Sequence, residues 1–201
     1  MKKLIFSIVL LALVGFGVTE PKLGDTERDM AVEELTNSKN HLTKTLKGLS
    51  EEQLNFKPSM DAWSIAECVE HIAISENTIY GMLEGALKTE ADPSKRSQVK
   101  MSDEQLIGMI TSRSQKVKTQ KPFEPTGKFG THKETLKAFL KKRKANIKYL
   151  KKTDDDLRNH YGQLPFGTID GLQILLFISG HSERHVLQIE EIMANDNFPK
   201  S

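Results

Sequence analysis

The 201-residue chain is poor in cysteine and in aromatic residues, with one Cys, one Trp and 6% aromatic content. A single Cys excludes an intrachain disulfide framework and zinc modules built on several thiolates. Charge of one sign is not in excess either, because 29 Lys and Arg face 27 Asp and Glu. This balance argues against a strongly basic nucleic-acid binder and against an acidic disordered tail. Any metal site must therefore use mainly histidine and carboxylate ligands.

Long apolar runs are missing as well, apart from a short one near the N-terminus. The basic start Met1-Lys2-Lys3 precedes an apolar run from Leu4 to Phe16. That run is shorter than the ~20 residues a membrane span needs. A basic start followed by a short apolar run is typical of a secretory signal peptide. We predict a signal peptide over residues 1–19, a domain over residues 20–201, and export to a periplasm or beyond, with no membrane contact after cleavage; an uncleaved anchor helix is the alternative.

The remainder shows helical periodicity, with apolar residues three and four positions apart. Four long helices are predicted over residues 25–49, 64–88, 131–152 and 168–194. No segment alternates between apolar and polar residues for long enough to predict a strand. The sequence therefore predicts an all-α protein, a four-helix bundle.

Helix starts are marked by capping boxes, in which a hydroxyl and a Glu or Gln three residues later satisfy each other's backbone donors. The four candidates are Ser64 with Glu67, Thr131 with Glu134, Ser50 with Gln53, and Ser102 with Gln105. Two of them predict short extra helices in the connections, one after Ser50 and one over residues 102–118.

Three histidines are the main candidates for chemistry. His181 and His185 are four residues apart on the last predicted helix, so their rings lie about one turn, or ~5.4 Å, apart on one face. Such a pair can share a cation, and His71 on the second helix can supply a third ligand. Three protein ligands leave one position open, as in a catalytic site. The alternative is that all three are ordinary surface or hydrogen-bonded core histidines, because the spacing alone is a short pattern.

Four neighbouring residues are candidates for supporting roles. Glu67, one turn before His71, could orient that ring, although its capping box already accounts for it. Gln188 could line a cavity. Arg143 lies on the apolar seam of the third helix, where it could bind an anionic substrate or form a buried ion pair. Cys68 could be a fourth ligand or a small packed side chain.

The third predicted helix is rich in lysine, but few aromatic residues accompany the lysines and three aspartates follow the helix directly. This pattern is typical of a solvated helix face, and we expect no nucleic-acid partner.

Two motifs resemble those of the DinB-like superfamily. The first runs from Trp63 to Ile72 (WSIAECVEHI), a Trp-Ser helix start with a histidine seven residues after the Ser. The second is GTID at residues 167–170 followed by HSERHVLQI at residues 181–189. The order and spacing of the motifs agree with that family over about residues 25–192.

The resemblance implies a four-helix bundle that holds a divalent metal, commonly zinc or nickel, through His71, His181 and His185. Relatives include transferases of low-molecular-weight thiols, a thiol-dependent maleylpyruvate isomerase and metal-dependent hydrolases. We therefore expect an exported metal-dependent enzyme that activates water or a thiol against a small-molecule substrate, and a homodimer is plausible. The leader departs from the pattern, because the known thiol cofactors are cytosolic. The alternative is a non-catalytic bundle that binds a metal or small ligand.

Overall fold

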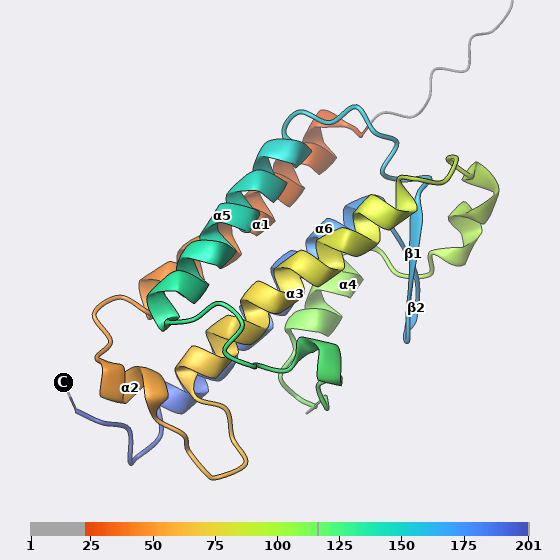
Figure 1. The fold of residues 1–201 in the computed structure, drawn as a ribbon. Helices are drawn as coiled ribbons and strands as arrows, with labels where there is room; N and C mark the ends of the chain where they lie inside the picture. Colours follow the sequence, from red (N-terminus) through yellow and green to blue (C-terminus); the bar gives the residue numbers. More distant parts are fainter. Residues whose placement is uncertain (1–22, 116, 201) are drawn as a thin grey trace, which may run out of the picture.

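The computed structural model describes residues 23–115 and 117–200, and its centre is a bundle of four long helices (Figure 1). They are α1 (Asp25–Thr45), α3 (Ile65–Ala86), α5 (His132–Leu150) and α6 (Gly171–Met193). Helix α6 packs against α1 and α3, and α5 closes the ring by packing against the same two helices. The predicted four-helix bundle is therefore confirmed.

The connections carry short helical elements: α2 (Glu51–Asn55), η1 (Pro93–Gln98), α4 (Asp103–Thr111) and η2 (Lys121–Phe123). All four predicted capping boxes form. The expected short helices are present as α2 and α4, but the range 102–118 was too long for α4. The backbone turns to an extended conformation at Ser112, whose hydroxyl bonds locally to Ser114, and such local bonds compete with helix formation.

A β-hairpin precedes α6, which corrects two predictions. Strands β1 (Tyr161–Leu164) and β2 (Gly167–Asp170) pair antiparallel, so the chain is mainly helical rather than all-α, and the last helix does not begin at residue 168. Each strand has four residues, too few for an alternating pattern to stand out. Helix α6 begins only after Asp170, whose carboxylate caps the helix in a box with Gln173.

The bundle core has two apolar clusters. One is centred on α6 residues 172–178 and the α1 residue Leu35, and the other on α3 residues 65–73, Leu42 and Phe139. In each long helix, buried polar side chains separate the residues of one cluster from those of the other. We call these polar side chains the arginine layer: Ser38, Glu76, Arg143, Asn146 and Ser182.

Arg143, at 0% exposure, is the centre of this layer. Its guanidinium donates to both carboxylate oxygens of Glu76 at 2.8 and 2.7 Å. It also donates to the Leu35 carbonyl and to the hydroxyls of Ser38 and Ser182. These bonds occupy all five N–H donors of an arginine. Of the two interpretations of Arg143, the structure shows the buried ion pair and leaves no donor for a substrate anion.

The predicted signal peptide, residues 1–19, lies outside the described residues and stays a prediction. Among the helices that the structure describes, none is both long enough and apolar enough to span a bilayer.

Candidate metal centre

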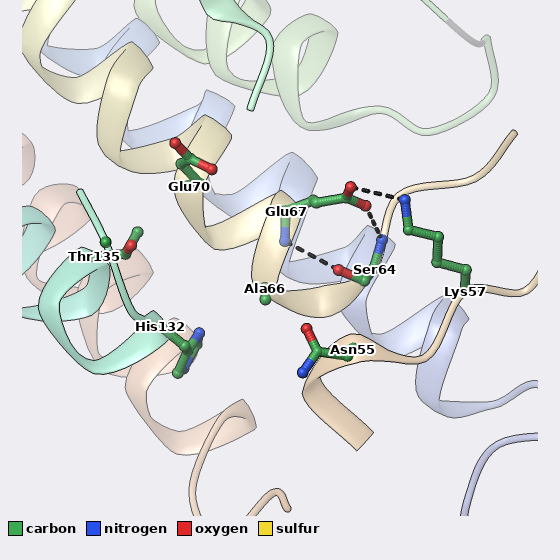
Figure 2. A pocket seen from close by; sticks show the side chains of 9 residues that line it. Asn55, Lys57, Ser64, Ala66, Glu67, Glu70, His132 and Thr135 are labelled. Carbon is green, nitrogen blue, oxygen red and sulfur yellow. Dashed lines mark hydrogen bonds and ion pairs between the residues drawn. The ribbon is translucent and has the colours of Figure 1, made fainter. Parts of the chain in front are cut away.

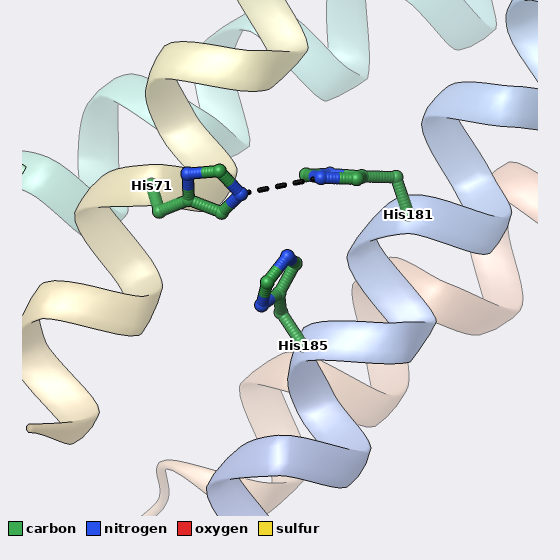
Figure 3. A group of neighbouring side chains, drawn as sticks. All are labelled: His71, His181 and His185. Carbon is green, nitrogen blue, oxygen red and sulfur yellow. Dashed lines mark hydrogen bonds between the residues drawn. The ribbon is translucent and has the colours of Figure 1, made fainter. Parts of the chain in front are cut away.

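Helices α3 and α6 bring His71, His181 and His185 together (Figure 3). One ring nitrogen of each lies within 4.8 Å of the others, and Nε2 of His71 is 3.2 Å from Nε2 of His181. Two nitrogens that each lie ~2.0–2.1 Å from one tetrahedral ion are separated by about 3.3 Å. The observed separation therefore fits two ligands of one metal ion.

Two of the rings are oriented by hydrogen bonds through their other nitrogen. Nδ1 of His71 donates to the Phe123 carbonyl at 2.7 Å, and Nδ1 of His185 donates to Oε1 of Gln188 at 2.8 Å. A carbonyl oxygen only accepts, so the proton must be on Nδ1. In the neutral imidazole this leaves a lone pair on Nε2, which is how second-shell acceptors prepare metal-ligating histidines.

The surroundings keep the three rings neutral. Burial lowers the pKa of His71, despite the opposing hydrogen bond to Phe123. Burial, followed by the charges of the other two rings, holds the pKa of His181 well below its usual value. Burial and then His71 lower the pKa of His185 to about 3. Since only neutral imidazole ligates a metal, the site needs no deprotonation step near neutral pH.

Aromatic side chains lie against the three histidines. The Trp63 ring is 4.9 Å from that of His71 and 6.2 Å from that of His185. The Phe177 ring stacks on that of His181, with centroids 5.9 Å apart. His71 and His185 are buried, whereas His181 is partly exposed. Of the three histidines, only His181 therefore keeps a partly accessible residue surface.

Two surface pockets lie near the centre. One, of about 160 Å³, lies between α3 and α5 and is lined by Glu67, Glu70 and His132 among others (Figure 2). The other, of about 390 Å³, is lined by Trp63 and by residues of the segment before α5. Neither pocket is lined by the three histidines, although the second shares Trp63 with them.

Of the four described residues predicted to support the site, only Gln188 is hydrogen-bonded to one of the three histidines. Glu67 forms its capping box with Ser64 and an ion pair with Lys57 at 2.7 Å. The His71 ring is oriented by the Phe123 carbonyl, not by Glu67. Gln188 orients His185. Cys68 is packed in the apolar core, where burial raises its pKa to about 12.

Sequence reasoning missed the segment that supports His71. Phe123 is 52 residues away and acts through its backbone, so no residue type signals it. The adjacent Glu70 accepts backbone N–H bonds from residues 126, 127 and 128, and so ties the same segment to α3. The contact between Gln188 and His185 could have been predicted from the sequence, because residues three apart on a helix are neighbours.

Comparison with known proteins agrees with this geometry. The family model for the DinB superfamily matches residues 34–189, which is most of the chain. The chain belongs to the DinB superfamily. All three histidines lie within the matched range.

One protein sequence and one solved structure are similar to this chain over most of their length. The uncharacterized protein YuaE of Bacillus subtilis (strain 168) is 30% identical over 150 residues, covering 73% of this chain and 87% of YuaE. The solved structure of YfiT from Bacillus subtilis aligns with a TM-score of 0.59 and 16% identity, covering 88% of this chain and 91% of YfiT. YfiT is reported as a probable metal-dependent hydrolase with an unusual four-helix bundle topology, and the similarity shows that this DinB chain shares its fold.

Proposed function

We propose that the protein is a metal-dependent enzyme that holds one divalent cation, zinc or nickel, between His71, His181 and His185. One observation carries the proposal: three neutral imidazoles from two helices aim ring nitrogens at one space, all within 4.8 Å of one another. In the structure, Nε2 of His71 and Nε2 of His181 are hydrogen-bonded at 3.2 Å, and a shared cation would replace the proton between them and take one lone pair from each of the three rings. The donor set suits zinc and nickel, since imidazole is a preferred ligand of both.

His71, His181 and His185 would hold a bound ion with one position left for water or substrate, and such an ion would supply Lewis-acid activation of water near neutral pH. The residues of the chain supply the geometry. Phe123 and Gln188 fix two rings, and Trp63 and Phe177 pack against the rings of His71 and His181. A low-polarity surrounding strengthens electrostatic interactions inside the site.

For the reaction, we propose hydrolysis of a small-molecule substrate. YfiT, which has the same fold, is reported as a probable metal-dependent hydrolase. Transfer of a low-molecular-weight thiol is the other reaction that the site could support. The proposed leader argues against it, because the thiol cofactors of the family are cytosolic.

A non-catalytic metal-binding bundle is the second candidate. One observation favours it: neither of the two surface pockets is lined by the three histidines. A binding protein needs the ligands but no room for a substrate beside them.

Metal analysis of the purified full chain tests the site. We expect one zinc or nickel ion per chain in the wild type and in His160→Ala, and loss of the ion in His181→Ala. His160 is a matched control, because its Nδ1 also contacts a backbone carbonyl, that of Ala86, but outside the cluster. Trp63, the only tryptophan of the chain, reports binding directly through quenching by Ni²⁺ or Co²⁺. Stoichiometric binding by His181→Ala would refute the site.

Turnover separates the two candidate functions. The metal-loaded chain is assayed against esters, amides and pairs of thiol and electrophile, with the metal-free chain and His181→Ala as controls. The hydrolase proposal predicts metal-dependent cleavage of an ester or amide without thiol. Activity only with a thiol supports the transferase, and activity with none of the substrate classes supports the binding bundle.

Location and assembly are further proposals. We propose export directed by residues 1–19, a free domain after cleavage, no nucleic-acid partner and a homodimer in solution. N-terminal sequencing of the protein from the source cells tests cleavage, and sedimentation equilibrium tests the dimer. A chain that starts at Met1 would contradict the cleaved leader.

A further inference from the structure

The β-hairpin that precedes α6 brings an exposed aromatic ring toward the metal centre. Phe166, in the turn between β1 and β2, is 39% exposed. Its ring lies 6.0 Å from that of Phe177 at an interplanar angle of 32°, and Phe177 lies 5.9 Å from His181 at 23°. Phe177 thus contacts both Phe166 and His181, and the three rings form a continuous series of contacts from the exposed Phe166 to the metal centre, which we call the aromatic row.

We propose that Phe177 and Phe166 are the specificity-determining residues of the site, and that they bind an aromatic group of the substrate. The substrate class is then an aryl compound, such as an aryl ester or amide, whose reacting bond lies at the metal centre. This inference rests on the proposed function, because it requires a metal bound by the three histidines.

The position of the row supports this role. Of the three histidines, His181 is the one residue that is partly exposed, and its neighbour Phe177 is partly exposed as well, so we place the approach of a substrate on this side. Phe177 is directly beside His181, and the exposed Phe166 ring lies 6.0 Å from that of Phe177. A first aromatic ring attached to the metal-bound group therefore meets Phe177, and a second ring in line with it meets Phe166.

The hairpin does not depend on Phe166 for its own position. Residues 161–164 pair with residues 167–170, and Thr168 also bridges to Val99 beside η1. At the base of the hairpin, Asp170 accepts hydrogen bonds from Arg96 and Arg158. These contacts hold the hairpin in place without the exposed Phe166 side chain. An exposed aromatic ring next to a site can pack against an aromatic group of a ligand.

Binding of three hydroxamates to the cobalt-loaded full chain tests the inference. Acetohydroxamate, benzohydroxamate and 4-phenylbenzohydroxamate present the same metal-binding group with no ring, one ring and two rings in line. Dissociation constants are read from the visible absorption of bound Co²⁺, after quenching of Trp63 has shown that cobalt is bound. The variants are Phe177→Leu, Phe166→Ala and Phe166→Leu, with Met60→Ala as control, because Met60 is an apolar side chain at 97% exposure outside the row.

In the wild type and in Met60→Ala, we expect each added ring to tighten binding by roughly two- to tenfold. Phe177→Leu should lose the gain from the first ring. Phe166→Ala should lose only the gain from the second ring, and Phe166→Leu should restore less than half of it. Equal affinity for the three probes in the wild type, or gains that survive in the Phe166 and Phe177 variants, would overturn the inference alone. Failure of cobalt to quench Trp63 would overturn the metal centre itself, and the inference with it.

Discussion

The arginine layer and the three histidines both draw on α3 and α6, but they satisfy their polar groups differently. In the arginine layer, every donor of Arg143 meets an acceptor within the bundle. In the histidine group, the outward nitrogens of His71 and His185 are satisfied, whereas the inward ring nitrogens converge on one another.

This difference separates a structural cluster from a binding one. The opposite charges of Arg143 and Glu76 neutralise each other and need no further partner. Because the pair is buried between helices, it fixes the helices relative to one another. Neutral acceptors that point at one space repel each other unless a proton or cation lies between them. The arginine layer therefore stabilises the bundle, and the histidines use the positions that the bundle provides.

The largest effect is expected from breaking the arginine layer. Arg143→Met leaves Glu76 buried without its partner, which should lower the free energy of unfolding by about 3–5 kcal/mol. Urea denaturation of the full chain measures it. The double variant Arg143→Met with Glu76→Leu removes both charges and should recover most of the loss. An Arg143→Met variant as stable as the wild type would show that the layer is not structural.

A smaller effect is expected from releasing one ligand. Gln188→Leu removes the acceptor for Nδ1 of His185 and should weaken metal binding by about 10- to 100-fold, with little change in unfolding free energy. Titration with Ni²⁺, followed by Trp63 fluorescence, gives the affinity. Gln188→Glu keeps an acceptor at this position and should retain tight binding. Equal affinity in Gln188→Leu and the wild type would contradict an orienting role.

The smallest effect concerns a surface histidine that differs from the three at the centre. Burial acts to lower the pKa of His41, but its hydrogen bonds to Glu183 and Glu190 outweigh burial and raise it. A raised pKa means that the stabilisation is fully present below about pH 6.5 and is lost as the pH rises through the folded-state value.

His41→Gln should therefore destabilise the protein at pH 6 by no more than about 1 kcal/mol, since the pair is partly exposed. At pH 9 the variant and the wild type should be equally stable in urea denaturation. A difference that grows with pH would contradict this sign.

Most of the bundle was predictable because its signals are local. Apolar spacing and capping boxes such as Ser64 with Glu67 depend on residues within one or two turns, and both appear in the structure. The pair at His181 and His185 follows from helical geometry in the same way. The DinB-like resemblance, which the family match bears out, joined His71 to them.

What was not predictable depends on contacts between distant segments. The Phe123 carbonyl reaches His71 through the backbone, and a four-residue strand has too short a pattern to be recognised. The hairpin was therefore missed, and with it the position of Phe166 near the centre. Arg143 was correctly predicted to lie on the apolar seam of its helix, but only the structure shows that Glu76 is its ion-pair partner.

The central claim is that three imidazoles share one metal ion. X-ray absorption spectroscopy of the zinc- or nickel-loaded full chain tests it most directly. The account predicts three imidazole nitrogens at ~2.0–2.1 Å, together with light-atom scattering from a further ligand. A sulfur neighbour at ~2.3 Å, which only Cys68 or a methionine could supply, or a shell without imidazole scattering, would contradict it.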